Sequence, residues 1–349
     1  KTHQIKSIQK TATYLVKDKQ TKQTMKYLVT GGAGFIGSNI VKALLERDDS
    51  VIIIDDFSQI SKEICRSRLG KLIEEYKTSE KGESKLKIIT GSVTDTKLLD
   101  KICSENKIDG IFHLAAIASV QKSIDDPIKS NQVNAVGTLN ILTAAKNHKI
   151  RKVVFSASAA AYGDNPIFPK KETMQTEPLS PYAVQKITSE MYCRIFSELY
   201  GVKTVSLRYF NVFGPGQDPN GEYAAVIAKF TEKITKHQSP TIYGSGEQTR
   251  DFVYVKDVVD ANLLSMDSEI TGLFNIGTGI QTSLNDLAEM IMKAAGIKAD
   301  IIYEKARDGD ILYSVADISK AKKILGYSPK YTIEDGIKET VKYFSSLAE

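Results

Sequence analysis

The sequence predicts an α/β protein: a doubly wound parallel sheet followed by a smaller α/β lobe on its C-terminal side. Short apolar runs alternate with longer segments of helical period from Lys26 onward, which is typical of repeated βαβ units. The first run ends in a glycine-rich turn that opens a helical segment. After about Phe210 the alternation gives way to a loop rich in glycine and proline, so we expect a second lobe to begin there.

The elements of the sheet are expected in a regular order. Six apolar runs have the length of strands: Tyr27–Thr30, Val51–Asp55, Leu86–Thr90, Gly110–Leu114, Lys152–Ser156 and Thr204–Arg208. Five segments between them have a helical pattern: Phe35–Arg47, Ser61–Tyr76, Thr96–Glu105, Pro127–Lys146 and Pro181–Tyr200. Crossover helices of this length suit both faces of a parallel sheet.

Composition excludes several classes of protein. The chain has 349 residues, of which 42% are hydrophobic and 26% charged, as in ordinary globular proteins. Its net charge of +5 lies in residues 1–24, which hold six lysines and one aspartate, so the rest sums to zero. A basic face for nucleic acid is therefore not predicted. The polar, basic segment 1–24 is a native extension, an added tail or a surface arm.

Metal, disulfide and membrane signals are absent from the sequence. Three widely spaced cysteines and four histidines without an i, i+4 pair predict no metal site, and His113 is expected to be a structural residue at a strand end. No apolar run approaches the roughly 20 residues that span a bilayer, and the first residues lack the layout of a secretory signal. We expect a cytoplasmic protein without a membrane partner.

The turn Thr30–Gly37 predicts a dinucleotide site. It follows the first strand and opens the first helix, where glycine permits a tight turn and a close approach of the backbone to a pyrophosphate. The helix start then offers free N–H groups to the anion. Asp55 ends the second strand, 24 residues after Gly31, where a carboxylate can accept hydrogen bonds from the adenosine ribose. Asp56, Phe57 and Ser58 supply no cation for a 2′-phosphate, so NAD is the expected cofactor.

Tyr182 and Lys186 are candidates for proton transfer. They stand four residues apart on a helix that begins at Pro181, so they share one face. A nearby ammonium favours the phenolate and lowers the pKa of a tyrosine. Such a pair is usually solvated, but its place after the fifth strand favours a catalytic role. Ser158, in a run of small residues ending that strand, is the third candidate, although a serine there often only bonds its own backbone.

Together these motifs resemble the extended short-chain dehydrogenase/reductase family, whose dinucleotide domain is a Rossmann fold. Within it the chain is similar to UDP-hexose 4-epimerases, through the glycine turn, Asp55, Ser158 and Tyr182-x-x-x-Lys186. Five further segments carry the similarity: Arg208–Gly214, Asp218–Gly221, Tyr223–Val226, Thr249–Phe252 and Arg307–Asp310. The chain departs from the family at Gly91-Ser92-Val93, where Gly-Asp-Ile is frequent. The resemblance implies a Rossmann domain at residues 25–210 and a mainly substrate-binding lobe at 211–349, with some segments returning to the first domain.

The resemblance also implies site residues. Cofactor contacts are expected at Gly31, Gly34, Phe35, Ile36, Gly37, Asp55, Asp56, Phe57, Ser58, Ser92, Val93, Leu114, Ala115, Ala116, Asn134, Ser158, Tyr182, Lys186 and Phe210. Substrate contacts are expected at Ser158, Tyr182, Asn211, Ala225, Val226, Tyr243, Arg250, Arg307, Asp310 and Ser314. The arginines suit a pyrophosphate because a planar fork of donors matches it, although either alone is more often a surface ion pair. A homodimer through the helix from Pro181 is implied as well, yet the stripe Ile187, Met191, Ile195 and Leu199 fits core packing equally.

The implied activity is NAD-dependent 4-epimerisation of UDP-N-acetylglucosamine and UDP-glucose through a 4-keto sugar. A tyrosine that excludes the 2-acetamido group in hexose-restricted relatives corresponds to the small Ser314 here. Three alternatives stay open: a UDP-uronic acid 4-epimerase, a dehydratase or decarboxylase, and a non-catalytic NAD-binding sensor. The second is disfavoured because Ala159, Ala160 and Ala161 stand where such enzymes carry an acid, and the third because it would not need Ser158, Tyr182 and Lys186 together.

Overall fold

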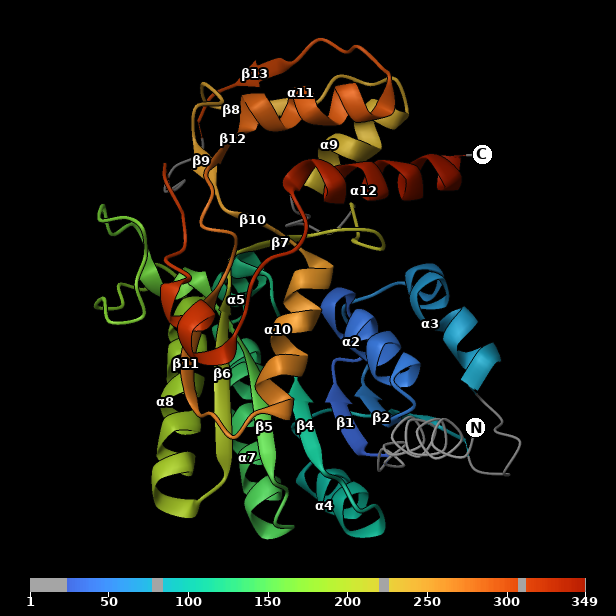
Figure 1. The fold of residues 1–349 in the computed structure, drawn as a ribbon, viewed down its shortest axis with the longest axis vertical. Coiled ribbons are helices and arrows are strands. Elements are labelled where there is room, and N and C mark those ends of the chain that lie inside the picture. Colours follow the sequence, from blue (N-terminus) through green and yellow to red (C-terminus); the bar gives the residue numbers. More distant parts are fainter. Residues whose placement is uncertain (1–23, 77–83, 220–225, 307–311, 349) are drawn as a thin grey trace, which may run out of the picture.

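A seven-stranded, all-parallel sheet forms the centre of the molecule (Figure 1). The computed structural model describes residues 24–76, 84–219, 226–306 and 312–348. The strand order is β3-β2-β1-β4-β5-β6-β11, which is the doubly wound order with a seventh strand added at one edge. The predicted fold class is therefore confirmed.

The strands that build the sheet are short and buried. Their bounds are β1 Lys26–Thr30, β2 Ser50–Asp55, β3 Leu86–Thr90, β4 Gly110–His113, β5 Lys152–Ser158, β6 Lys203–Tyr209 and β11 Gly272–Ile276. Adjacent residues face opposite cores: Leu28 belongs to one apolar cluster and Val29 to the other. Both faces are thus dry, which explains why the sequence shows continuous apolar runs here.

Helices cover both faces of this sheet. One core includes Leu44 of α2 (Phe35–Glu46), Leu69 of α3 (Lys62–Tyr76) and Val258 of α10 (Val255–Asp267). The other includes residues of α4 (Thr96–Glu105), α7 (Gly137–Asn147) and α8 (Pro181–Tyr200). Ser180 accepts a hydrogen bond from the Ala183 N–H at 3.2 Å and Gly201 adopts a φ of 71°, so α8 begins and ends where the sequence predicts.

Three expectations about the sheet and its helices are corrected. The fourth strand ends at His113, and the N–H of Leu114, the next residue, donates to both the carbonyl and the hydroxyl oxygen of Thr30. The helix expected over Pro127–Lys146 is instead α6 (Pro127–Asn131), a π-helical turn (Gln132–Val136) and α7. The seventh strand, β11, was not among the six predicted runs and pairs with β6 from residues 272–276. The expected boundary near residue 210 is consequently not sharp, since α10 and β11 lie beyond it and pack on the first sheet.

The second lobe lies above the carboxyl ends of the strands (Figure 1). Its helices α9 (Val226–Thr235), α11 (Leu284–Ala295) and α12 (Ile333–Ala348) share a third apolar core. Its strands form three short pairs: β7 (Asn211–Phe213) with β10 (Phe252–Tyr254), β8 (Thr241–Tyr243) with β13 (Ile302–Glu304), and β9 (Thr249–Arg250) with β12 (Thr282–Ser283). The short helix α5 (Val120–Asp125) comes after β4, and a 3-10 turn (Ala159–Tyr162) directly follows β5.

The described segments contain neither a candidate membrane span nor a candidate metal cluster. None of their helices combines the length and the apolar character that crossing a bilayer requires. Nor do three or more His, Cys, Asp or Glu side chains in those segments meet in a way that could hold a metal ion.

Candidate active site

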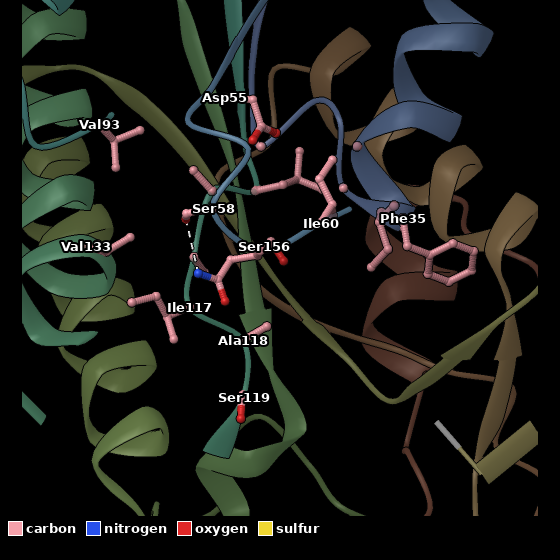
Figure 2. Close-up of a pocket in the computed structure, with 18 of the residues that line it drawn as sticks. Phe35, Asp55, Ser58, Ile60, Val93, Ile117, Ala118, Ser119, Val133 and Ser156 are labelled. Carbon is pink, nitrogen blue, oxygen red and sulfur yellow. Dashed lines mark hydrogen bonds between the residues drawn. The ribbon is translucent and has the colours of Figure 1, made fainter. Parts of the chain in front are cut away.

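A cavity of about 710 Å³ opens at the carboxyl ends of the sheet strands, where doubly wound folds bind ligands. Figure 2 shows Asp55, Val93, Val133 and Ser156 arranged around this space, with Phe35 on the side of α2. Most of the predicted cofactor residues lie on its walls: Gly31, Gly34, Phe35, Ile36, Gly37, Asp55, Asp56, Ser58, Ser92, Val93, Leu114, Ala115, Ala116, Ser158, Tyr182, Lys186 and Phe210.

The glycine turn leaves no room for side chains. Gly31 has a φ of 67°, and a Cβ added to it would lie 2.7 Å from the Ala115 nitrogen. A Cβ on Gly37 would collide with the carbonyl oxygen of Gly31. The turn therefore presents bare backbone to the cavity, at the start of α2 where no side chain caps the helix. Such a start attracts an anionic group, because its free N–H groups and the helix dipole both favour negative charge.

Asp55 holds the two loops at the mouth of this turn. Its carboxylate accepts hydrogen bonds from the Ala33 N–H at 3.0 Å and the Phe57 N–H at 2.9 Å. Burial raises the pKa of this carboxyl, whereas the two backbone bonds lower it. A bare glycine turn, an uncapped helix start and a carboxylate at the end of the second strand fit the pyrophosphate and ribose of a dinucleotide.

A neutral histidine supports the wall next to the glycine turn. One ring nitrogen of His113 lies 2.7 Å from the Thr30 hydroxyl and the other 3.0 Å from the Thr138 hydroxyl. Burial lowers the pKa of His113 to about 3, so the ring stays uncharged. The Thr30 hydroxyl in turn accepts from the N–H groups of Leu114 and Ala115, which fixes the cavity loop. His113 is structural, as the sequence indicated.

Two predicted cofactor residues do not line the cavity. Asn134 is buried within the π-helical turn, where its amide bonds both backbone groups of Ile117 and, at 2.8 Å, the Gln185 side chain. It therefore positions the cavity loop and the tyrosine helix. The Phe57 side chain packs against the core, and only its N–H contributes, by bonding Asp55.

The three predicted catalytic side chains meet at one end of the cavity. Ser158 ends β5, and its hydroxyl accepts from the Ala160 N–H at 3.2 Å, which is the ordinary bond of a strand-end serine. The same hydroxyl lies near enough to the Tyr182 phenol to lower its pKa. Lys186 lies one helical turn further, with its Nζ 5.8 Å from the centre of the Tyr182 ring, and donates to the Ser156 carbonyl at 2.7 Å.

The expected effect of Lys186 on Tyr182 is not seen in this structure. Burial raises the pKa of Tyr182, and the Ser158 hydroxyl is the group that lowers it. Lys186 is itself buried, which lowers its own pKa to about 8, and its ammonium is turned to the backbone of β5. The prediction was incomplete because spacing on a helix gives proximity and says nothing of desolvation.

Among the described residues of the cavity wall, no acidic side chain stands beside Ser158. Ala159, Ala160 and Ala161 form the 3-10 turn that follows it. The carboxylates on the cavity wall are Asp55, Asp56 and Asp218. None of these belongs to the β5 end, so the described wall near Ser158 offers no carboxylic acid to an elimination.

Predicted substrate residues meet where the chain crosses between the lobes. The Asn211 N–H donates to the Asp251 carbonyl at 3.0 Å, and the Ser314 N–H donates to the Thr249 carbonyl at 3.2 Å. Arg250 lies between Thr249 and Asp251 in the sequence. Its guanidinium donates to the Thr249 carbonyl at 2.9 Å. Asn211, Arg250 and Ser314 are thus brought together, although they do not line the main cavity.

The remaining substrate residues are more scattered. Val226 begins α9, and Tyr243 ends β8 opposite Glu304 of β13. Ala225, Arg307 and Asp310 lie outside the described residues, as do the segments 220–225 and 307–311 of the family-like motifs.

The structure adds an arginine that the sequence did not single out. Arg68 of α3 lines the cavity and donates to the Ala33 carbonyl at 3.1 Å and to the Gly216 carbonyl at 2.9 Å. It joins the glycine turn to the loop that enters the second lobe. The sequence signal that could have identified Arg68 is a cation next to the apolar face of a helix. Other wall residues that were not predicted include Gln59, Ile60, Ile117, Ser119, Lys122, Val133, Gln217 and Asp218.

Comparison with family models gives one match over most of the chain. Residues 28–340 match the model described as GDP-mannose 4,6 dehydratase. This span includes the glycine turn, the tyrosine helix and most of the second lobe.

Solved structures of similar fold are nucleotide-sugar enzymes. A UDP-N-acetylglucosamine 4-epimerase from Methanobrevibacter ruminantium, in complex with UDP-N-acetylmuramic acid, is 43% identical with a TM-score of 0.84, covering 93% of this chain and 99% of that one. A UDP-glucose 4-epimerase with UDP-glucose from Thermotoga maritima is 39% identical with a TM-score of 0.85, covering 93% and 100%. A UDP-glucuronic acid 4-epimerase from Bacillus cereus, bound to its substrate and NAD, is 31% identical with a TM-score of 0.82, covering 93% and 100%.

Proposed function

The chain belongs to the extended short-chain dehydrogenase/reductase family of NAD-dependent nucleotide-sugar enzymes, and on that premise we propose that it is a UDP-sugar 4-epimerase that accepts 2-acetamido sugars. Its substrates are UDP-N-acetylglucosamine with UDP-N-acetylgalactosamine, and UDP-glucose with UDP-galactose. The M. ruminantium and T. maritima enzymes, named for these two sugar classes, support this range.

One observation carries the proposal: Ser158, Tyr182 and Lys186 share one end of a dinucleotide-sized cavity, and no acid among the described wall residues stands beside Ser158. A phenol and a hydroxyl in contact can pass a proton to or from a sugar hydroxyl. A dehydratase would need a further acid to complete elimination. Because the described wall near Ser158 has none, a reversible change at carbon 4 fits best.

The proton path begins at the phenol. Tyr182 takes the proton of the 4-hydroxyl, directly or through the Ser158 hydroxyl, and returns it to the 4-keto oxygen after the sugar has turned. Lys186, once its ammonium is free to serve the phenol and the ribose of the cofactor, stabilises the phenolate. The small side chains of the 3-10 turn after Ser158 leave space for either face of the sugar.

NAD, when bound, supplies reversible oxidation at carbon 4 of the sugar. The chain's own residues hold and orient it: the glycine turn meets the pyrophosphate, Asp55 the adenosine ribose and Lys186 the other ribose. Ser92, Val93 and Leu114 enclose the rest of the cavity wall. Since the same cofactor is regenerated each cycle, activity should not need added NAD once the protein carries it.

The acceptance of 2-acetamido sugars rests on Ser314. This half-buried residue lies beside Arg250 through the bond from its N–H to Thr249. A serine there leaves a volume that a larger side chain would fill. Arg250, and Arg307 by resemblance, are proposed to hold the UDP pyrophosphate.

The direct test is incubation with four substrates in separate reactions, without added NAD. UDP-glucose, UDP-galactose, UDP-N-acetylglucosamine and UDP-glucuronic acid are each followed by product separation and proton NMR. We expect carbon 4 to invert in the first three. Turnover of UDP-glucuronic acid alone would favour the uronic acid activity instead, a 4-keto-6-deoxy product would indicate a dehydratase, and no turnover by NAD-loaded protein would contradict the proposal.

We further propose that the enzyme is a homodimer through α8. Ile187 is buried in the core, but Met191 is 57% exposed and Leu199 is 67% exposed on the same helix. Ile128 of the adjoining α6 is 78% exposed. A second copy of the chain would cover this apolar surface. Light scattering should give twice the monomer mass for the wild type, and a monomer for Met191→Glu/Leu199→Glu.

A further inference from the structure

A line of charged groups lies behind the catalytic lysine. Tyr182, Lys186 and Glu190 follow one another at four-residue steps on α8, so they form one stripe of the helix. Lys186 is 3% exposed and Glu190 is 8% exposed, because this stripe packs on β5 and β6. Two ionisable groups one turn apart and out of solvent interact far more strongly than on a surface.

Glu190 is held by an arginine of the sheet. Arg208 of β6 donates from Nε to one carboxylate oxygen at 2.9 Å and from Nη2 to the other at 2.7 Å. Its guanidinium lies 4.6 Å from the centre of the Tyr162 ring, and the Tyr162 hydroxyl donates to the Asn275 side chain at 2.6 Å. The two-pronged bond, the ring and the buried neighbours leave Glu190 with one orientation.

The other groups around Lys186 offer it no counter-charge. From β5 it meets the Ser156 carbonyl at 2.7 Å and the Phe155 ring at 5.0 Å. From β4 it faces His113, which is neutral. On its own helix Cys193 has a pKa that burial raises to about 12, so its thiol is uncharged at neutral pH. Among the described residues packed around Lys186, the carboxylate of Glu190 is the anion that offsets its burial.

These positions give Glu190 a task beyond pairing with Arg208. Burial lowers the pKa of Lys186 to about 8, and the charge of Glu190 opposes this fall. Burial likewise raises the pKa of Glu190, while the bonds and charge of Arg208 lower it. The arginine thus keeps the carboxylate ionised, and the carboxylate acts on the lysine.

We propose that Glu190 and Arg208 are positioning residues for the reaction: the carboxylate keeps Lys186 in its charged form behind Tyr182, and the guanidinium keeps the carboxylate ionised and in place. This inference rests on the proposed function for the role of the lysine. It assigns the pair a part in proton transfer, where a buried ion pair alone would only contribute to folding.

The pH dependence of kcat tests the pair. Glu190→Gln removes the charge and keeps the shape, so Lys186 loses its proton earlier and the alkaline limb of the profile should move down by about one pH unit. Glu198→Gln is the matched control, because Glu198 pairs with Arg194 on the exposed face of the same helix. The control should leave the limb where it is in the wild type.

A double variant separates charge from stability. Glu190→Gln alone strands a buried guanidinium, so it is compared with Glu190→Gln/Arg208→Met, in which the guanidinium is removed as well and Lys186 alone has lost its counter-charge. The proposal expects the double variant to keep an acid shift, smaller than that of the single one. A wild-type profile in the folded double variant would overturn the proposal, and so would one in folded Glu190→Gln.

A spectroscopic measurement makes the result independent of turnover. The titration of Lys186 is followed by carbon NMR of isotope-labelled lysine side chains, in which its signal is assigned by its loss in Lys186→Met. With Glu190 replaced, Lys186 should lose its proton at a lower pH, because no carboxylate then opposes the effect of burial. An unchanged titration would contradict the proposal even if no UDP-sugar is turned over, whereas absence of turnover with a shifted titration would count only against the proposed function.

Discussion

The two lobes are held together in different ways. In the sheet, neighbouring strands exchange regular backbone bonds over four to seven residue pairs, as between β5 and β6. In the second lobe the paired strands are two or three residues long. In that lobe the carboxylate of Asp251 connects separate segments by hydrogen bonds. It accepts from the Thr278 N–H and hydroxyl at 2.7 and 2.8 Å, from the Gly279 N–H at 2.9 Å and from the Ala316 N–H at 3.1 Å.

This difference suggests a division of labour. Backbone hydrogen bonds between strands form with many different side chains. The same sheet can therefore hold the dinucleotide in enzymes that act on different sugars. A lobe that depends on one buried carboxylate places a few side chains accurately, and its surroundings can change with the substrate. The cofactor side should therefore respond to changes in backbone geometry, and the sugar side to changes in single side chains.

The largest effect is expected where the two lobes meet, at Tyr182. Tyr182→Phe removes the acid–base group and should lower kcat by ~10²–10⁴-fold while bound NAD is retained. Tyr192→Phe, on an exposed position of the same helix, is the control and should be near normal. Wild-type turnover by Tyr182→Phe would remove this residue from the mechanism.

On the cofactor side, one added methyl group tests whether NAD binding needs the bare backbone of the glycine turn. Gly37→Ala places a Cβ against the Gly31 carbonyl oxygen, so the turn must shift. NAD affinity should fall by about 10- to 10²-fold, because one hydrogen bond to a charged group is worth about 1.5–3 kcal/mol. Gly70→Ala on α3 is matched, because its Cβ would lie 3.4 Å from one Arg66 carbon. Calorimetric titration with NAD measures both, and equal affinities would contradict the bare-backbone account.

On the sugar side, the stability of the lobe should depend strongly on Asp251. Asp251→Asn turns an amide donor toward groups that are themselves donors, so the free energy of unfolding should fall by about 3 kcal/mol. Asp260→Asn, which breaks only an exposed pair with Lys330, should cost about 0–1 kcal/mol. Urea unfolding measures the loss. If the two variants were equally stable, Asp251 would not be the joint of this lobe.

The smallest expected effect concerns choice of sugar. Ser314→Tyr should lower kcat/KM for UDP-N-acetylglucosamine about 10-fold or more relative to UDP-glucose, because the new ring occupies the room for the acetamido group. Leu312→Tyr, a nearby position that is 61% exposed, should leave the ratio unchanged. Equal losses on both sugars after Ser314→Tyr would refute the gate.

The sequence predicted the regularly built parts of the molecule well. Helix α8 was predicted to the residue because Ser180 and Gly201 mark its ends, and α4 and β3 were predicted as closely. The glycine turn and one carboxylate predicted the edge of the sheet where the cavity lies, since parallel strands end at a common edge, whereas the other expected cofactor residues came from the family resemblance. Local signals suffice where local structure determines position.

What could not be predicted depends on contacts across the fold. The π-helical turn at Gln132–Val136 reads as ordinary helix until Asn134 is seen to bond Ile117 and Gln185. Glu190 and Arg208 lie on a helix and a strand, and no spacing rule pairs them. The desolvation that raises the pKa of Tyr182 is likewise a property of the packed site. Each of these arises only when distant segments have met.

The late position of β11 in the chain has a consequence for biosynthesis. Its partner β6 ends at residue 209, yet β11 spans Gly272–Ile276, with much of the second lobe between them. On the ribosome, the edge of β6 must wait, unpaired, until those residues have emerged. The nascent chain thus passes through a stage in which a ready template for aggregation is exposed, and early assembly of the lobe between them would shorten that exposure.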